Sequence, residues 1–433
     1  MPKNATHKRN YCPFLIPPPT TSFVIVGPRV ICYAPESSFS RCLSLGNIHW
    51  KSVFLTSYLV RLWVRGHASE DGWISVHSKT LKHFMGERDY LRVISALEDD
   101  DGALSVSRQY FVGQASRRYK LRSDLLDEIV PCEIRNRPLA KKLIALRVGT
   151  WKKAQKPFYK DVLSSMEKMS FDADGAEEEM AGSNLPPAVR DYWQRSINAM
   201  RYKAYFASIA PQTNRLYYNI TGLPRELRKY LSLDGDALCE VDIKCCQPYL
   251  MSFFYKDLPS HNAEKHRYLE VVKSDFYGYM AKSSGHNIAR DDAKRLVYTY
   301  VLFDKVRDHP MWQAFAKEFP LLARIVAMKK TTKHNRLSIH LQNLEASWMF
   351  KRVIRTLSKA GIFAATVHDS VICRKQDVEK VRSTLEQAFK GADGNFPLLS
   401  VKEYNEALKH VVKSTSQKPT PFTPYRTDKV MLV

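Results

Sequence analysis

The stretch Leu238-Cys-Glu-Val-Asp-Ile-Lys-Cys-Cys-Gln-Pro-Tyr-Leu-Met251 decides how this chain folds, because it sets one aspartate, Asp242, in an apolar run. A second aspartate, Asp369, lies in a similar run, Ala365-Thr-Val-His-Asp-Ser-Val-Ile-Cys373. Both runs are typical of buried strands. A carboxylate in an apolar strand is costly unless it is paired or binds a cation. Two such strands side by side predict one divalent-metal site with two carboxylates.

A site of this kind is the minimum that two-metal phosphoryl transfer requires. In that chemistry two ions about 3.5–4 Å apart activate the attacking oxygen and stabilise the leaving one. Mg²⁺ suits the task because it keeps waters and substrate phosphates in its shell. We therefore expect two Mg²⁺ ions, with Mn²⁺ as a substitute, held by Asp242 and Asp369.

A basic helix is predicted between the two aspartates, over residues 289–302. Arg290, Lys294, Tyr298 and Leu302 recur there every four positions, which puts them on one helix face. Cations suit a triphosphate, and a ring suits a base and its sugar. The alternative is an amphipathic surface helix with chance charges, but the position between two aspartate runs favours nucleotide binding.

In this order, the motifs resemble the palm and fingers of family A DNA polymerases and the related single-subunit RNA polymerases. Two further segments fit the resemblance, which spans roughly residues 210–374. Gln212-Thr-Asn-Arg-Leu216 is similar to the element near the primer–template, and Arg336-Leu-Ser-Ile-His-Leu-Gln342 to the element that touches the template minor groove. The resemblance implies an α+β right-hand polymerase, with an antiparallel palm sheet, helical fingers and a thumb.

The resemblance also implies a role for each matched residue. Asp242, Asp369 and the carbonyl of Ile243 would hold the metal ions. Arg290 and Lys294 would bind the β and γ phosphates, and Lys294 would also protonate the departing pyrophosphate. Tyr298 would stack on the incoming nucleotide. The residues expected to contact the primer–template are Thr213, Arg215, Arg336, Gln342 and His368.

Three departures from the family pattern leave the choice of sugar open. Gln247 and Ser370 stand where DNA polymerases of the family usually carry glutamate, and Leu302-Phe303 replace tyrosine-glycine. A serine at the position of Ser370 is similar to the pattern of the phage-type RNA polymerases. The resemblance implies that Gln247 and the Tyr298 ring form a steric fence over C2′, and Leu302 leaves bulk beside it. We therefore expect these residues to contribute to nucleotide selection and dNTPs to be preferred, less strongly than in a typical replicative enzyme.

Composition indicates a polyanionic partner. The 433 residues carry a formal charge of +23, which favours nucleic acid; a merely basic scaffold is the alternative, and the acidic pair argues against it. Eight cysteines without a CxxC pair make zinc a poor expectation. No apolar stretch suffices to span a membrane. We expect a cytoplasmic protein of a bacterial host or virus, although the acid-free first ten residues leave an organelle transit peptide open.

Residues 46–122 predict a helix, a strand, two helices and a hairpin, an order that resembles a winged helix. Ser78 and Asp89 are expected to cap the paired helices. Winged helices bind DNA through the second paired helix and the wing, and the cations available for phosphates are Arg88, Arg92, Arg108, Arg117 and Arg118. A winged helix used for protein contact is the alternative.

The predicted organisation has five parts. An extended arm (1–45) that adds one strand precedes the winged-helix-like domain (46–122), a helical linker or thumb-like region (123–209) with an acidic loop at Asp172–Glu179, the palm and fingers (210–413) and a tail (414–433).

The predicted function is template-directed nucleotidyl transfer, by a DNA polymerase of a small replicon that uses primed DNA and nucleoside triphosphates. A single-subunit RNA polymerase or primase is the alternative enzyme. A non-catalytic DNA-binding replication factor is the alternative of another class, and accessory replication proteins would be further partners.

Overall fold

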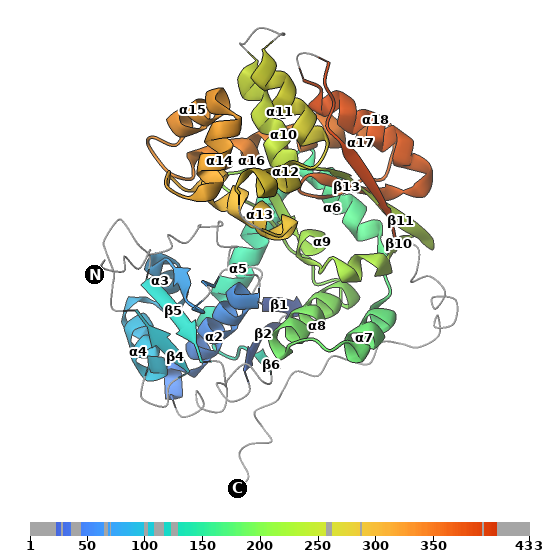
Figure 1. Cartoon of the computed structure of the whole chain (residues 1–433). Helices are drawn as coiled ribbons and strands as arrows, with labels where there is room; N and C mark the ends of the chain where they lie inside the picture. Colours follow the sequence, from blue (N-terminus) through green and yellow to red (C-terminus); the bar gives the residue numbers. More distant parts are fainter. Residues whose placement is uncertain are drawn as a thin grey trace, which may run out of the picture.

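The computed structural model describes residues 23–26, 29–35, 45–64, 68–69, 71–98, 103–107, 117–122, 129–256, 262–285, 288–391 and 394–404. The fold is mixed α+β, with many helices and antiparallel sheets. Buried apolar side chains form two main cores, one from residues 23–143 and one from residues 154–404. In Figure 1 the first core underlies the blue elements at the lower left, and the second underlies the elements at the top and right.

The sheet that carries both predicted aspartates lies in the second core. Its strands are β7 (Ser170–Phe171), β10 (Leu231–Leu233), β11 (Asp236–Ile243), β12 (Ala365–Val367), β13 (Ser370–Arg374) and β14 (Leu399–Glu403). The order is β12-β13-β11-β10-β7, and β14 pairs with the other side of β11. Every pairing is antiparallel. The central strand β11 is therefore covered on both edges, as its apolar sequence predicts.

Both aspartate runs are shorter as strands than the sequence predicts. The first run leaves β11 after Ile243 and becomes helix α10 (Cys246–Met251). The second is a hairpin, since Val367 pairs with Ser370 and a two-residue turn holds His368 and Asp369. His368 has a φ of 58°, a left-handed conformation that is uncommon for residues other than glycine. Asp369 thus lies in a turn, and the expectation that it lies within a strand is wrong.

Helices surround this sheet, and those from α10 to α16 gather in the upper part of Figure 1. After α10 the chain forms η5 (Ser252–Tyr255), α11 (Ala263–Lys273), α12 (Phe276–Ser283), α13 (Arg290–Leu296), η6 (Val297–Phe303), α14 (Pro310–Glu318), α15 (Pro320–Lys329), α16 (Arg336–Trp348), η7 (Met349–Ile354), α17 (Arg355–Lys359), η8 (Lys375–Asp377) and α18 (Val378–Phe389). The segments η6 and η7 are π-helical. Such turns are rare and recur at functional sites.

The N-terminal region contains the elements predicted for residues 46–122, in the predicted order. They are η2 (Gly46–Ile48), α2 (His49–Val64), β3 (Ile74–Val76), α3 (Ser78–Met85), α4 (Glu87–Glu98), β4 (Leu104–Val106) and β5 (Arg117–Leu121). The strands form an antiparallel sheet in the order β3-β5-β4. Residues 108–116 of the predicted hairpin, Arg108 among them, and the tail at 414–433 lie outside the described residues.

The predicted caps of α3 and α4 are both wrong. His77 caps α3, since its Nδ1 accepts a hydrogen bond from the Lys79 amide at 3.2 Å. Asp89 lies inside α4, in its first turn, and its carboxylate pairs with Lys51 of α2. A tertiary ion pair therefore uses the side chain that the local pattern assigns to a cap.

The arm and the linker share a second sheet. Strands β1 (Phe23–Val26) and β2 (Arg29–Pro35) pair with each other, and β2 also pairs with β6 (Ile129–Glu133). The arm thus supplies two strands where the sequence predicts one. The remaining elements are α5 (Arg137–Ala154), α6 (Tyr159–Lys168), α7 (Ala173–Gly182), α8 (Pro187–Arg201), β8 (Ala207–Ile209), β9 (Leu216–Tyr218), α9 (Asn219–Gly222) and η4 (Glu226–Tyr230).

The predicted acidic loop at Asp172–Glu179 is instead the start of helix α7. Asp172 caps it by accepting a hydrogen bond from the Gly175 amide at 3.1 Å. Acidic side chains near a helix N-terminus are favourable, so the charge run stabilises the helix. A Cβ at Gly175 would come within 2.6 Å of the Asp172 carboxylate, which explains a glycine in this helix.

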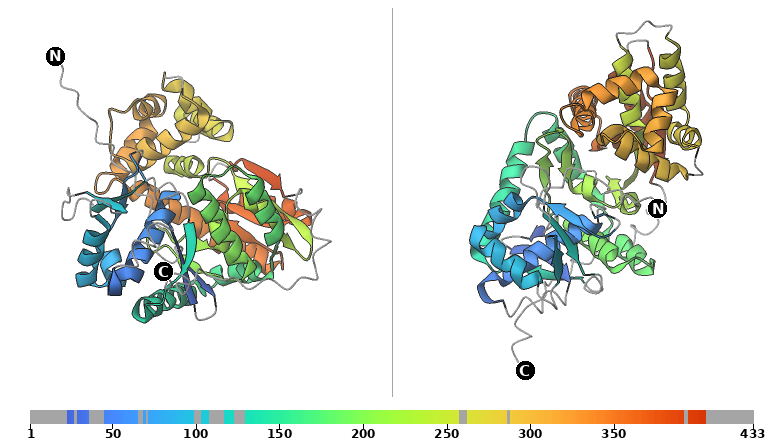
Figure 2. Two further views of the ribbon diagram at one scale, coloured as in Figure 1. Left: turned by 90° about the horizontal axis from the view of Figure 1, so that it is seen from below. Right: turned by 60° about the vertical axis from the view of Figure 1, so that its left-hand side comes forward.

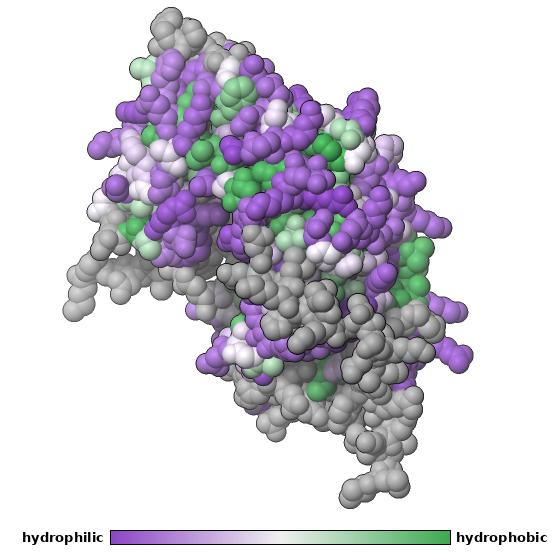
Figure 3. All heavy atoms as spheres, turned by 90° about the vertical axis from the view of Figure 1, so that its right-hand side faces the viewer, coloured by the Kyte–Doolittle hydropathy of each residue, from purple (hydrophilic) through white to green (hydrophobic). Residues whose placement is uncertain are grey.

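The outer surface is largely hydrophilic on the face that Figure 3 shows, with apolar groups scattered in small areas. Among the described residues, no helix is both long and apolar enough to cross a membrane. The right-hand view of Figure 2 shows the yellow and orange helices at one end of the molecule and the blue N-terminal elements at the other.

A buried acid ties the sheet together beside Asp242. Glu240 accepts hydrogen bonds from Ser370 Oγ at 2.7 Å, from Arg228 Nη1 at 3.3 Å and from the Tyr404 hydroxyl. Ser370 thereby joins β13 to β11, and Tyr404 joins the end of β14 to the same carboxylate.

We expect Tyr404→Phe to lower the free energy of unfolding by roughly 1–3 kcal/mol, because a buried carboxylate loses one donor. Urea denaturation of the purified chain measures this. Tyr217→Phe is the control, since its ring packs edge-on against His368. Equal stability of the Tyr404→Phe variant and the wild type would show that the network contributes little.

Candidate active site

Asp242 and Asp369 lie side by side at one end of the central sheet, as the sequence predicts. Asp242 is directly opposite Ser370 in the β11–β13 register. The amide of Ile243 donates a hydrogen bond to the Asp369 carbonyl oxygen at 3.2 Å. Strand β11 and the His368–Asp369 turn therefore bring the two carboxylates to neighbouring positions.

A third carboxylate, Glu345 of α16, lies at the same place and was not predicted. Its side chain is 1% exposed. One ligand atom each from Glu345, Asp369 and Cys246 lie within 4.8 Å of one another. The sequence holds one clue, an acid at the centre of the apolar helix from Leu341 to Phe350, but the pattern alone does not say which neighbour faces it.

Glu345 is held by two residues that sequence analysis assigned other roles. Arg215 binds it through two hydrogen bonds, from Nε to Oε1 at 2.8 Å and from Nη2 to Oε2 at 2.7 Å. Gln247 donates its amide to the same Oε2. A glutamate at position 247 would instead face the Glu345 carboxylate at hydrogen-bond distance, and like charges repel. The glutamine is therefore the residue that suits a site in which α16 supplies the acid.

The acids at this site repel one another and are poorly hydrated. Burial, and then the charge of Glu240, raise the pKa of Asp242 to about 6, while Lys294, Arg225 and Lys244 act in the opposite direction. Burial, and then Glu345 and Asp242, raise the pKa of Asp369 well above its usual range. A bound cation removes this penalty.

The donor set fits a hard divalent ion such as Mg²⁺. Carboxylate oxygens of Asp242 and Asp369, with the adjacent Ile243 carbonyl, match the oxygen ligands that Mg²⁺ prefers. Burial, and then Glu345, keep the pKa of the Cys246 thiol well above its usual value, so its sulfur stays protonated. Ligation by Cys246 is therefore unfavourable, and the carboxylates remain as ligands.

The basic helix presents its cations beside one aromatic ring that was not predicted, Tyr277 of α12. The Arg290 guanidinium is 5.7 Å and the Lys294 ammonium 5.8 Å from the centre of the Tyr277 ring. The Tyr298 ring stacks on Tyr277 with centroids 6.5 Å apart. Arg290 also binds Asp275 at 2.8 Å. Both cations are exposed, so this face is available to an anionic ligand.

The predicted placement of four residues on one α-helical face applies only to the first two of them. Arg290 and Lys294 lie in α13, but Tyr298 and Leu302 lie in the π-helix η6, where the turn is wider. Leu302 is fully buried and Gln247 is 3% exposed. Both residues therefore lie behind the surface of the site, where they affect its shape through the side chains in front of them.

The two segments expected at the primer–template contact each other. The Asn214 side-chain amide donates to Asn343 Oδ1 at 2.6 Å, and Asn343 in turn donates to the Gln212 carbonyl. Thr213 is fully buried. Gln342 is half-buried, and Arg336 is exposed with a hydrogen bond to Thr332.

The N-terminal cations lie on the outer surface. Arg88, Arg92 and Arg118 are exposed, and Arg117 is half-buried. Arg88 and Arg92 belong to α4, whereas Arg117 and Arg118 belong to β5. Arg118 also lies over the Trp73 ring, with 5.6 Å from its guanidinium carbon to the ring centre.

Comparisons with known proteins give a likeness among solved structures. No family model and no curated protein match the chain. Among solved structures, the POL domain of Pol1 from M. smegmatis, in complex with DNA primer-template and dNTP, is similar over 54% of this chain and 55% of that one. The sequence identity is 13% and the TM-score is 0.35. The chain thus spans about half the length of that domain.

We expect Mg²⁺ affinity to fall steeply with acidity, because protons compete for the same carboxylates. Burial raises the pKa of Asp242 to about 6, so its carboxylate takes up a proton as the pH falls through this region. The affinity for Mg²⁺ should then drop about tenfold per pH unit for each proton displaced. Calorimetric titration at pH 5 to 8 measures this, and buffers of different ionisation heat count the protons released. An affinity that is constant across pH 5 to 7 would contradict the assignment.

Proposed function

We propose that this chain is a template-directed nucleotidyltransferase, and specifically a DNA polymerase. The observation that carries the proposal is the meeting of Asp242 and Asp369 at one sheet end, within reach of the charge of Lys294. Two carboxylates for metal ions and a cationic face for a triphosphate are the parts that phosphoryl transfer needs.

Each residue has a defined task in this proposal. Asp242, Asp369 and the Ile243 carbonyl would hold Mg²⁺, which activates the primer hydroxyl and stabilises the leaving oxygen. Arg290 and Lys294 bind the β and γ phosphates, and Lys294 gives its proton to the leaving pyrophosphate.

The aromatic and polar residues position the reactants. Tyr298, stacked on Tyr277, supports the incoming nucleotide. Arg215 is fixed by Glu345 and thereby sets the position of the loop that leads into β9, beside α16. The primer–template would lie across this loop and α16, where we propose contacts from Arg336, Gln342 and His368.

An RNA polymerase or primase on the same palm is the second candidate. The sequence departures at Gln247 and Ser370 favour it. The structure gives both departures a local reason, since Gln247 binds Glu345 and Ser370 binds Glu240. Because these contacts account for both residues, Gln247 and Ser370 are weaker evidence for a ribonucleotide substrate than the sequence pattern suggests.

A non-catalytic DNA-binding factor, the candidate of another class, would not need this acidic site. Poorly hydrated carboxylates that repel one another are costly without a cation. Their presence beside Lys294 favours an enzyme. Primer extension with dNTPs and rNTPs on one primed template separates the three candidates.

We expect Asp242→Ala and Asp369→Ala each to reduce nucleotide addition at least about a thousandfold, because the metal ions lose a ligand. DNA affinity should stay within about threefold of the wild type. Asp234→Ala is the matched control, since Asp234 is an exposed acid of the same sheet region, paired with Arg374. Near-normal extension by either active-site variant would refute the site assignment.

We expect the wild type to incorporate dNTPs more efficiently than rNTPs, and Gln247→Ala to narrow the difference. Bulk blocks a 2′-hydroxyl, whereas preference for ribose needs a polar partner that rewards it. Removing Gln247 opens space and releases Glu345. The ratio of incorporation efficiencies on one primed template measures this, with Gln313→Ala of α14 as control. Equal or better use of rNTPs by the wild type would favour the RNA polymerase candidate.

We also propose that α4 and β5 contact DNA phosphates. Replacing Arg88, Arg92, Arg117 and Arg118 with glutamine should weaken DNA binding and lower the slope of log affinity against log salt by up to about 3–4. The control replaces four exposed lysines of the C-terminal part, Lys359, Lys375, Lys380 and Lys390. An unchanged salt slope in the arginine variant would indicate that this region contacts protein.

A further inference from the structure

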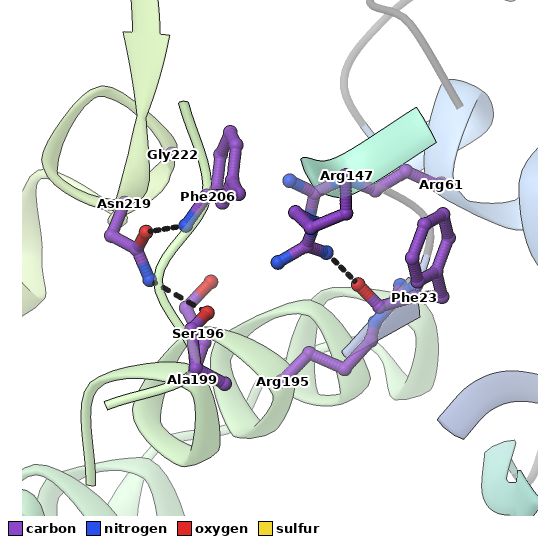
Figure 4. A pocket seen from close by; sticks show the side chains of 10 residues that line it. Phe23, Arg61, Arg147, Arg195, Ser196, Ala199, Phe206, Asn219 and Gly222 are labelled. Atoms are coloured by element: carbon purple, nitrogen blue, oxygen red, sulfur yellow. Dashed lines mark hydrogen bonds between the residues drawn. The ribbon is translucent and has the colours of Figure 1, made fainter. Parts of the chain in front are cut away.

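A cavity that the proposed activity does not use lies between the N-terminal elements and the elements that lead to the palm. Its lining residues come from distant parts of the chain: Phe23, Arg61, Arg147, Arg195, Ser196, Ala199, Ala204, Phe206, Asn219 and Gly222. The cavity has a volume of about 40 Å³ and opens in part to solvent. Figure 4 shows three arginines from different elements converging on it.

The three arginines are buried far more than arginines usually are. Arg61 and Arg195 are 4% exposed, and Arg147 is 6% exposed. None of the ten lining residues is acidic. One carboxylate stands close by, Asp191, whose Oδ2 is 2.6 Å from Arg195 Nη2. Three guanidinium groups therefore line one space to which no lining residue brings a negative charge, and such a space favours an anionic ligand.

Two of the arginines are held in place by backbone carbonyls and aromatic rings. Arg147 donates from Nη2 to the Phe23 carbonyl at 2.7 Å and from Nη1 to the Tyr205 carbonyl at 3.3 Å. Its guanidinium lies 4.9 Å from the Phe23 ring centre and 5.4 Å from that of Phe206. Arg61 stacks 4.4 Å over the Tyr192 ring.

Arg195 supplies the unsatisfied donors. Its Nε and Nη1 are buried and make no hydrogen bond to any residue that the structure describes. A buried donor without an acceptor is unfavourable, and a guanidinium matches the oxygens of a phosphate group in a two-pronged geometry. The polar side chains of Ser196 and Asn219 line the same space.

We propose that this cavity binds a phosphate group, and that the bound anion fastens the N-terminal elements to the palm. Arg61 lies in α2, Arg147 in α5 and Arg195 in α8. One anion between them links elements of both cores. Enclosed arginines exclude the backbone of a duplex, so the ligand is a small phosphorylated species, either free phosphate or the phosphate of a nucleotide.

The test measures thermal unfolding of the full chain without Mg²⁺, in an Arg290→Gln/Lys294→Gln background that removes the proposed triphosphate contacts. Inorganic phosphate, pyrophosphate, AMP and ATP replace chloride at constant ionic strength. We expect at least one of them to raise Tm by several degrees in a saturable manner. A larger shift with phosphate or pyrophosphate identifies a free anion, and a larger shift with AMP or ATP identifies a nucleotide.

Variants connect the shift to the cavity. Arg195→Gln and Arg61→Gln should each reduce the ligand-induced shift, measured from the variant's own Tm, to less than a third. Arg324→Gln, which removes one exposed arginine of α15, should keep the full shift. If a cavity variant fails to fold, the other decides the test. No shift with any of the four anions, or a shift that both cavity variants retain, would overturn the proposal.

Discussion

The repulsion among three carboxylates, one buried and two half-buried, is the constraint on which the rest of the structure depends. Asp242, Asp369 and Glu345 converge where β11, a hairpin turn and α16 meet. Arg215 neutralises Glu345 through two hydrogen bonds, and among the described residues neither aspartate has an equivalent arginine partner. Such an arrangement is unfavourable in a merely structural role, but it is what a divalent-metal site requires before the ion binds.

The departures from the polymerase pattern make sense around this constraint. Glutamine at position 247 donates to Glu345, where a glutamate would add a further negative charge. Serine at position 370 donates to Glu240, which Tyr404 and Arg228 also bind. Each substitution removes an acid beside another acid. The number of negative charges near Asp242 and Asp369, the proposed metal ligands, is thereby limited.

Local pattern was enough to predict the neighbouring aspartates, the basic helix and the order of elements in residues 46–122. The local pattern did not predict side-chain partners that lie far apart in the sequence. Glu345 reads as one acid in an apolar helix, and only packing shows that it faces Arg215. The local pattern assigns Asp89 to a helix cap. It does not reveal the ion pair with Lys51, because the two residues lie far apart in the sequence. The cavity arginines come from three separate helices, so no local motif marks them.

The most direct measurement is a crystal structure of the full chain with Mn²⁺, a primed template and a non-hydrolysable dNTP, in which anomalous scattering locates the metal. We predict Mn²⁺ at roughly 2.1–2.2 Å, close to the Mg²⁺–oxygen distance, from carboxylate oxygens of both Asp242 and Asp369, with the triphosphate beside Arg290 and Lys294. Mn²⁺ bound elsewhere while these two carboxylates stay without an ion would contradict the account.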